Sequence, residues 1–256
     1  MKQISSILLF VLTAILLQSC DPFFWKNGRD EKQVHIPHYV MGYLDNAKEL
    51  SIDHYGYEGS IDISWAHSVL VLGWDSKGED LEKYKALCTK NGDTKYEALS
   101  SVVGKDGGFN YLNHGRYYYN SNAITGINVT SDAAWDETHP AGTSLNDIII
   151  FHSNALDPFI KAGYKGFFAW NEKAQKFVPT TPENSHSNKL GKIECRLSKF
   201  DFSSCRLLGM GEVKLASLKI GKKPTQEKKH IIKIEVLFED GTKTSKLISV
   251  NYPENN

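Results

Sequence analysis

The sequence predicts an all-β fold, and three observations support that prediction. Short stretches alternate apolar and polar residues with period two, most clearly at 61–65 and 232–238. Turn-forming Gly, Asn, Asp and Pro residues separate these stretches, and only residues 79–90 place apolar side chains at helical spacing. About nine candidate strands and one helix together predict an immunoglobulin-like β-sandwich with one short packed helix.

The first expected elements are two strands and the helix. Residues 61–65 have the sequence Ile-Asp-Ile-Ser-Trp, which is typical of a half-buried strand. Residues 69–72 form a solid apolar run that ends at Gly73. The apolar residues of 79–90 include Cys88, so we expect this helix to pack on the sandwich with Cys88 facing the core.

A set of aromatic residues lies close together around 113–116, and it comprises Phe109, Tyr111, Tyr117, Tyr118 and Tyr119. Because adjacent strand residues point to opposite faces, only part of the set fits into a core. The exposed remainder would form a patch suited to a sugar or a protein partner. The alternative is a cross-strand aromatic cluster that caps the core. The candidate ligand-binding aromatics are Tyr117, Tyr119, Trp135 and Trp170.

Two hairpins are expected in the second half of the chain. The apolar stretches 166–170 and 176–178 flank a short polar segment that fits a turn. At the C-terminus, two strand-like runs, 232–238 and 242–250, flank Asp240-Gly241. An Asp-Gly pair between alternating runs is a strong hairpin signal, so this element is the clearest of the chain.

The composition excludes one class of partner. The chain of 256 residues has 30 basic and 30 acidic residues, and the two signs are interspersed along it. Nucleic-acid binding relies on clustered positive charge, so we expect no nucleic-acid partner.

The N-terminus has the parts of an export signal. Lys2 precedes an apolar run of 11 residues, 7–17, which is too short to cross a hydrocarbon core about 30 Å thick. The run ends in Leu17-Gln18-Ser19-Cys20, which resembles the lipobox of bacterial lipoproteins. That resemblance implies removal of residues 1–19 and acylation of Cys20, which would anchor the protein to a membrane. An ordinary signal peptide with a chance cysteine is the alternative.

The expected organisation follows from this leader. Residues 1–19 form the signal peptide, 20–50 the anchor and N-terminal segment, and 51–256 the sandwich domain. We expect a lipid-anchored protein of the cell envelope, at the outer membrane. Asp21 alone does not decide between the periplasmic and the surface face.

Three cysteines remain once Cys20 carries lipid. Cysteines of exported proteins tend to pair, because the environment is oxidising. Cys195 and Cys205 are close in sequence and flank a turn-like segment, so we expect them to form a disulfide. The alternative is three buried, unpaired thiols. We expect no catalytic role for Cys88, because nothing near it supplies an activating histidine.

Two other groups have reactive side chains without the spacing that the chemistry requires. His35 and His38 lack a third metal ligand nearby, so we expect structural or surface histidines. The acidic residues around His139 lack the EF-hand spacing for Ca²⁺. A Ser144–His139–Asp147 triad lacks the Gly-x-Ser-x-Gly context. The sequence therefore predicts no catalytic residue, no metal and no cofactor.

One segment resembles a known group of proteins. Residues 124–148 contain a strand ending in Thr-Ser-Asp, a His-Pro-Ala-Gly turn and the run Ser-Leu-Asn-Asp. Together with the lipobox and the C-terminal hairpin, this segment resembles uncharacterised exported lipoproteins of the Bacteroidetes. The resemblance implies an exported domain of unknown function.

Three functions remain open at this point. The anchor, the β architecture and the many Trp and Tyr residues favour a non-catalytic binding or interaction module for a glycan or protein partner. The alternatives are a structural component of the envelope and a glycan-active hydrolase that uses two carboxylates.

Overall fold

The structure is a computed structural model, in which the chain forms two compact units. One unit comprises Met1–His35 and Leu99–Asn113, and the other comprises Ile36–Ala98 and His114–Asn256. The described residues are 32–34, 38–45, 50–55, 60–65, 70–73, 75–96, 101–103, 109–110, 118–181, 191–208 and 216–252.

The described part of the first unit is a small antiparallel sheet with the strand order β1-β6-β7. Its strands are β1 (Lys32–Val34), β6 (Ser101–Val103) and β7 (Phe109–Asn110). All other described elements belong to the second unit.

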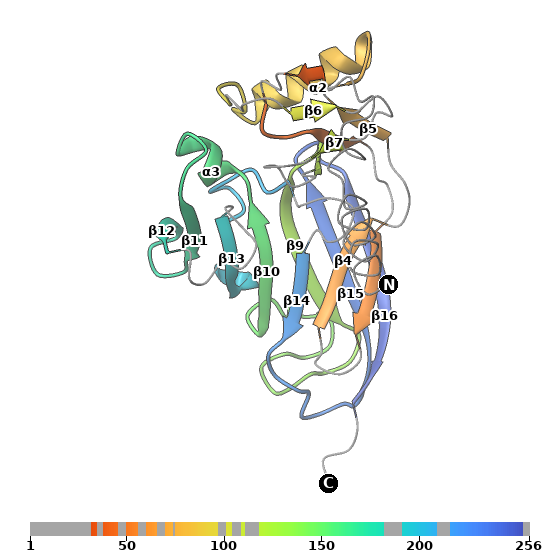
Figure 1. The fold of residues 1–256 in the computed structure, drawn as a ribbon. Coiled ribbons are helices and arrows are strands. Elements are labelled where there is room, and N and C mark those ends of the chain that lie inside the picture. Colours follow the sequence, from red (N-terminus) through yellow and green to blue (C-terminus); the bar gives the residue numbers. More distant parts are fainter. Residues whose placement is uncertain are drawn as a thin grey trace, which may run out of the picture. The chain divides into compact units, whose positions relative to one another are not determined.

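Two facing β-sheets form most of the second unit (Figure 1). The larger sheet has the strand order β12-β11-β13-β10-β14-β4-β3, and the smaller has the order β16-β15-β9. Neighbouring strands are antiparallel except for the parallel pair β11–β13. The strands are β3 (Leu50–Tyr55), β4 (Ser60–Trp65), β9 (Ile124–Ser131), β10 (Ile149–Ala155), β11 (Phe167–Asn171), β12 (Lys176–Thr180), β13 (Gly191–Arg196), β14 (Ala216–Ile220), β15 (Lys229–Phe238) and β16 (Lys243–Asn251).

One apolar cluster, the sandwich core, connects the two sheets. Strands β10 and β15 alternate buried and more exposed residues, as the period-two geometry of a strand requires. Phe151 and Leu218 of the larger sheet and Val129 and Ile234 of the smaller sheet are fully buried in this core. Fully burying an apolar side chain of this size stabilises the fold by about 1.5–3 kcal/mol relative to exposing it.

The predicted all-β, sandwich-like fold with a short helix is confirmed, and so are both hairpins, β11–β12 and β15–β16. Gly241 in the second hairpin has a φ of 82°, a conformation that favours glycine. An immunoglobulin constant domain divides seven antiparallel strands four and three. Here the larger sheet alone has seven described strands, one pair of them parallel, so the strand order differs from that connectivity.

Helix α2 (Glu79–Lys90) confirms the predicted helix and packs on a small third sheet of the same unit. That sheet has the order β5-β2-β8, with strands β2 (Gly42–Asp45), β5 (Leu70–Gly73) and β8 (Tyr118–Asn120). Strand β2 lies within residues 20–50, which the sequence predicts to be the anchor and N-terminal segment.

A second apolar cluster, the α2 cluster, lies between these elements. It contains Tyr84 and Cys88 of α2, so Cys88 faces a core as predicted. Its other buried members are Tyr39, Val40, Tyr43, Leu72, Tyr119, Ala123, Leu156, Phe159, Ile160 and Leu208.

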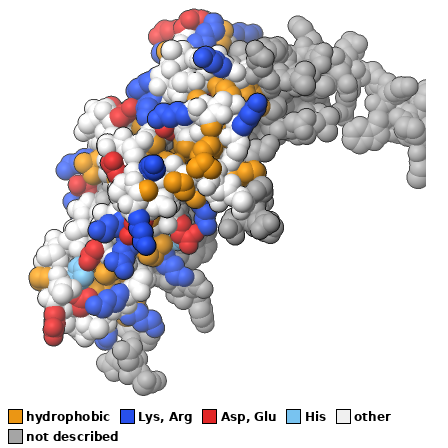
Figure 2. All heavy atoms as spheres, turned by 90° about the vertical axis from the view of Figure 1, so that its left-hand side faces the viewer, with side chains coloured by type: hydrophobic (Ala, Val, Ile, Leu, Met, Phe, Trp, Pro, Cys, Tyr) orange, Lys and Arg blue, Asp and Glu red, His pale blue; other side chains and the backbone are white. Residues whose placement is uncertain are grey.

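Helix α3 (Asp157–Lys161) was not predicted, because five residues are too few to show a helical period. Its Phe159 and Ile160 belong to the α2 cluster. Figure 2 shows the face that carries α3, β11 and β12, where acidic and basic side chains are interspersed around a group of apolar ones. Within the described ranges, no helix combines the length and the apolar character needed to cross a membrane.

Candidate functional site

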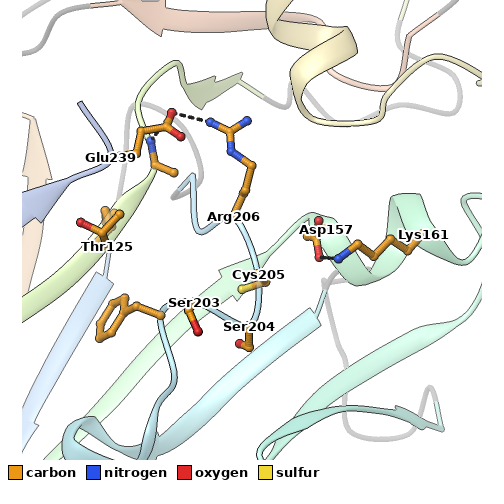
Figure 3. Close-up of a pocket in the computed structure, with 11 residues that line it drawn as sticks. Thr125, Asp157, Lys161, Ser203, Ser204, Cys205, Arg206 and Glu239 are labelled. Atoms are coloured by element: carbon orange, nitrogen blue, oxygen red, sulfur yellow. Dashed lines mark hydrogen bonds and ion pairs between the residues drawn. The ribbon is translucent and has the colours of Figure 1, made fainter. Parts of the chain in front are cut away.

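Helix α3 lines two hollows with both polar and apolar lining that share part of their walls. The smaller, of about 340 Å³, is lined by the start of β9, by α3, by residues 202–206 and by Glu239 (Figure 3). The larger, of about 530 Å³, is lined by the end of α2, the turn after it, α3 and the residues that follow α3. Asp157 and Lys161 line both hollows, so the two hollows adjoin and form one candidate site.

The smaller hollow contains a charge cluster centred on Glu239, which follows β15. Glu239 Oε1 accepts hydrogen bonds from Lys90 Nζ at 2.8 Å, from the Ala123 N–H at 3.3 Å and from Arg206 Nη2. The Nη1 group of Arg206 donates to Asn91 Oδ1. Burial alone would raise the pKa of Glu239, but these donors outweigh it and hold the pKa below its usual value. Glu239 is therefore an ionised, neutralised carboxylate.

A second charge pair lies on α3 itself. Lys161 Nζ is 2.7 Å from Asp157 Oδ2, one helical turn away. This pair and the Glu239 cluster come from different elements and line the same hollow (Figure 3). Ser203 and Ser204 also line it. Both hydroxyls donate to Asp201, so they add acceptor oxygens to the ion pairs of the lining.

Tyr164 lines the larger hollow in a strained backbone conformation. Its φ of 61° is in the left-handed region, which costs a residue with a side chain on the order of 1–3 kcal/mol. Gly163 and Gly166 on either side also have positive φ. The Tyr164 hydroxyl donates to Asp93 Oδ1 at 2.9 Å and accepts from the Lys95 N–H at 3.3 Å. These bonds help to hold the strained turn.

Asp93, the partner of Tyr164, has a carboxylate that is completely buried. Its Oδ1 also accepts the Tyr39 N–H at 2.9 Å, and its Oδ2 accepts the Val40 N–H at 2.8 Å. Burial raises the pKa of Asp93, and the hydrogen bonds and nearby His38 offset that effect only in part. The carboxylate thus fixes the segment before β2 against the turn after α2.

His38, Cys88 and Asp93 form a compact group of metal-ligating side chains. A ring nitrogen of His38, Sγ of Cys88 and a carboxylate oxygen of Asp93 lie within 4.8 Å of one another. Burial raises the pKa of the Cys88 thiol to about 12. Two predictions from the sequence concern this group: that the chain binds no metal, and that no histidine lies near Cys88. The second expectation was wrong, because folding brings His38 to Cys88 from a distant part of the chain.

The structure does not assemble the Ser144–His139–Asp147 triad. Both ring nitrogens of His139 face carboxylates, with Nδ1 2.7 Å from Asp136 Oδ1 and Nε2 2.9 Å from Asp147 Oδ1. Ser144 Oγ donates instead to Asn128 Oδ1 at 3.0 Å. His139 is therefore held between two acids and does not contact the serine that a triad requires.

This histidine belongs to an ionised network that fixes the His-Pro-Ala-Gly turn. Lys222 Nζ is 2.8 Å from Asp136 Oδ2. Lys222, together with Thr138 and His139, holds the pKa of Asp136 well below its usual value. Burial lowers the pKa of His139, but Asp136 and Asp147 outweigh burial and raise it. Asp136 is one of the acidic residues around His139 that were considered as Ca²⁺ ligands. Its carboxylate oxygens instead contact Lys222 and His139.

The predicted ligand-binding aromatics require a correction. Tyr119 and Trp135 are 0% exposed and Trp170 is 7% exposed, so none of the three presents a ring face to solvent. Tyr119 lies in the α2 cluster, and both tryptophans lie in the sandwich core, where the Trp135 Nε1–H donates to the Lys222 carbonyl at 2.9 Å. These three side chains are therefore core residues, which is the alternative given for the aromatic set. Tyr117 lies outside the described residues.

The predicted disulfide also requires a correction. Cys195 and Cys205 are separate buried thiols, and Cys88 is a third. Cys195 lies in β13 opposite Phe151, whereas Cys205 follows a 3₁₀ helix and a turn that lead the chain to the smaller hollow. Burial raises the pKa of both thiols to about 12. The predicted lipid-attachment residue Cys20 lies outside the described residues.

Sequence reasoning missed the residues that shape the candidate site. Those residues are Asp93, Tyr164, Arg206 and Glu239, while His38 is expected from the sequence only as a structural or surface histidine. The one local signal was the pair of glycines around Tyr164, which indicates a turn with positive φ. The other residues converge through the fold, so no short-range spacing marks them.

Comparison with known proteins found no matching family model, no matching curated protein and no matching solved structure. The resemblance to exported lipoproteins of the Bacteroidetes therefore stays a prediction from the sequence.

Proposed function

We propose that this chain is a lipid-anchored cell-envelope protein that binds a small, neutral, polyhydroxylated ligand, such as the end of a glycan, beside α3. The observation that carries the binding role is the pair of hollows that share Asp157 and Lys161. Their volumes, about 340 and 530 Å³, are in the range of small-molecule sites. The anchor is inferred from Leu17-Gln18-Ser19-Cys20, outside the described residues.

The charges of the lining favour a neutral ligand over an ion. Asp157 neutralises Lys161, while Lys90 and Arg206 both contact Glu239. Of the cations that line the hollows, only Lys95 has no such ion pair among the described residues, whereas a site for phosphate or carboxylate would be expected to present several. Paired charges and hydroxyl groups instead present donors and acceptors side by side, which match the hydroxyl groups of a sugar.

Tyr164 supplies the aromatic surface that the predicted aromatics do not. Its ring is half-buried and lines the larger hollow, and its hydroxyl is fixed by Asp93. The ring also packs against Tyr39, Tyr96 and Phe159, so only its exposed part is available to a ligand that has both apolar ring faces and polar edges. We therefore place the ligand ring against Tyr164 and its hydroxyl groups toward α3.

A glycan array probed with the purified full chain tests the binding role, followed by calorimetry with the strongest ligand. We expect Lys161→Ala to weaken binding about tenfold, because it removes one charged donor from both hollows. Lys192→Ala is the matched control, because Lys192 also forms an exposed ion pair but lies on β13. Failure of the wild-type chain to bind any glycan, or equal binding by both variants, would refute the role.

Fractionation of cells that express the full chain tests the anchor separately. We expect wild type in the membrane fraction and Cys20→Ala in the soluble fraction, because that change removes the acyl attachment site. Cys205→Ala is the control and stays with the membrane. A soluble wild-type protein would favour the ordinary signal peptide.

A glycan-active hydrolase is the second candidate, since two carboxylates, Asp157 and Glu239, line the smaller hollow. A glycosidase needs one of its acids protonated, which requires a raised pKa. The pKa of Glu239 is lowered, and Asp157 is paired with Lys161, so the geometry favours binding without turnover. Release of reducing sugar from a bound glycan would decide for the hydrolase.

A further inference from the structure

We propose that His38, Cys88 and Asp93 form a binding site for one Zn²⁺ ion, with a fourth position left for water. Three donor atoms lie within 4.8 Å of one another and come from three segments. His38 precedes β2, Cys88 lies in the last turn of α2, and Asp93 lies in the turn that follows. The site adjoins the proposed glycan site, because Asp93 also accepts a hydrogen bond from the Tyr164 hydroxyl, but metal binding and glycan binding are measured separately.

The donor set fits zinc better than the alternatives. It combines one imidazole nitrogen, one thiolate sulfur and one carboxylate oxygen, all of which are zinc ligands. Calcium and magnesium bind oxygen ligands and do not favour sulfur. Three protein ligands with one open position is the arrangement of zinc sites that bind water or a small ligand.

The spacing requires only a small contraction. With zinc–ligand bonds of about 2.0–2.3 Å at tetrahedral angles, neighbouring donor atoms are about 3.4–3.6 Å apart. From the 4.8 Å limit, two donor atoms would therefore have to approach each other by about 1.2–1.4 Å at most. Side-chain rotation provides a movement of this size, so the backbone fold is compatible with the site.

The hydrogen bond of His38 prepares its ring for coordination. Nδ1 lies 2.5 Å from the backbone carbonyl oxygen of Asp93. A carbonyl oxygen only accepts, so Nδ1 carries the proton and the neutral ring has its lone pair on Nε2. Metal-ligating histidines commonly make this bond to a carbonyl, because it fixes the tautomer and the orientation of the ring.

The Cys88 thiol lies beside two tyrosine hydroxyls, although its burial disfavours a thiolate until a metal is bound. The hydroxyls of Tyr43 and Tyr84 contact the Cys88 thiol. Tyr43 Oη accepts a hydrogen bond from Asn91 Nδ2 at 2.9 Å, so its own proton remains available to the sulfur. Donors to a ligating sulfur are outer-shell contacts of the kind that support metal sites.

A zinc ion would also balance the buried charge. Asp93 forms no ion pair with a lysine or arginine in the part of the chain that the structure describes. Buried charges normally have a partner or coordinate a metal, because transfer from water is costly. With Cys88 as a thiolate and Asp93 as a carboxylate, two negative charges would match the two positive charges of Zn²⁺.

Cobalt substitution of the full chain, purified in detergent, reduced and stripped with chelator, tests the site. We expect one equivalent of Co²⁺ to produce a thiolate-to-cobalt charge-transfer absorption band that added Zn²⁺ removes. Cys88→Ala loses this band, whereas the matched control Cys205→Ala, which truncates another buried thiol, keeps it. Absence of the band in the wild type, or its persistence in Cys88→Ala, would overturn the proposal.

His38→Gln is the second variant, because a half-buried residue is replaced with little risk to folding. We expect its Zn²⁺ affinity to fall at least about tenfold, and zinc to stop raising its melting temperature. His152→Gln, which changes another half-buried histidine, binds and responds like wild type. Equal affinity of all three chains would place the ion elsewhere and refute the site.

Discussion

The sandwich core and the α2 cluster belong to the same unit and both bury apolar side chains, but the polar groups buried beside them have different partners. The sandwich core is formed by apolar residues such as Phe151 and Leu218, arranged by the period of the strands. The α2 cluster surrounds buried polar groups, among them Asn91 and Asp93. Burying such groups costs stability unless every one has a partner. Beside the sandwich core, Ser131 bonds to His230 of the neighbouring strand, whereas Asp93 joins the segment before β2 to the turn after α2. The difference teaches that the buried polar groups of the α2 cluster connect segments that strand pairing does not connect.

Truncation in the sandwich core should have the largest effect. Phe151 is completely buried and contacts Phe200 and Phe202 through its ring. We expect Phe151→Ala to lower the free energy of unfolding by about 3–5 kcal/mol, because it leaves a cavity. Urea denaturation measures this loss. Phe168→Ala, at a half-buried position, should cost clearly less, and equal costs would mean that the core is not organised as described.

Removal of the buried charge tests the α2 cluster. Asp93→Asn preserves the shape of the side chain but turns one acceptor oxygen into a donor that faces a backbone N–H. We expect a loss of about 1–3 kcal/mol in the free energy of unfolding, from one unpaired group. The exposed Asp75→Asn is the control. An unchanged free energy of unfolding in Asp93→Asn would show that this carboxylate does not hold the segment before β2 in place.

The pH dependence of stability distinguishes the His139 network from both cores. The folded-state pKa of His139 is raised above 6.5, so its contribution is fully present below that pH and is lost as pH rises through the folded pKa. We expect His139→Gln to flatten this part of the unfolding free energy, measured by denaturation at pH values from about 6 to 9. The control His152→Gln should keep the wild-type slope. An unchanged slope in His139→Gln would assign it to another group.

A substitution on the outer face of β16 should have the smallest effect. Leu247 is 62% exposed and contributes to neither apolar cluster. We expect Leu247→Ser to change the free energy of unfolding by no more than about 0.5 kcal/mol. A larger loss, measured in the same urea titration as Phe151→Ala, would mean that this face of the sheet is covered.

The sandwich was easier to predict from the sequence than the α2 cluster, for a physical reason. Strands such as 232–238 show their alternation locally, and the Asp240-Gly241 turn brings partners together that are close in sequence. Period two does not say which face is covered, so Tyr119, Trp135 and Trp170 were assigned to a ligand surface although they are buried. Burial depends on the neighbouring sheet, which no single strand encodes.

The candidate site depends on contacts between distant segments. His38 and Asp93 are separated by 55 positions, and Arg206 and Asn91 by 115. No spacing rule connects such residues, because loop closure through the fold brings them together. The Cys195–Cys205 prediction failed in the opposite way: proximity in sequence suggested contact, but the intervening 3₁₀ helix and turn separate the two thiols.

Strand β12 contains a proline at the edge of the larger sheet, and this proline affects how copies of the protein could associate. It is the outermost strand in the order of the larger sheet, and its Pro179 pairs with Phe168 of β11. Proline has no N–H, so this rim of the sheet offers an interrupted row of donors to any strand from a neighbouring molecule. With the lipid anchor that we propose, the protein would meet its own copies at high local concentration in the plane of the membrane. Pro179 would then keep crowded neighbours from joining into a continuous sheet.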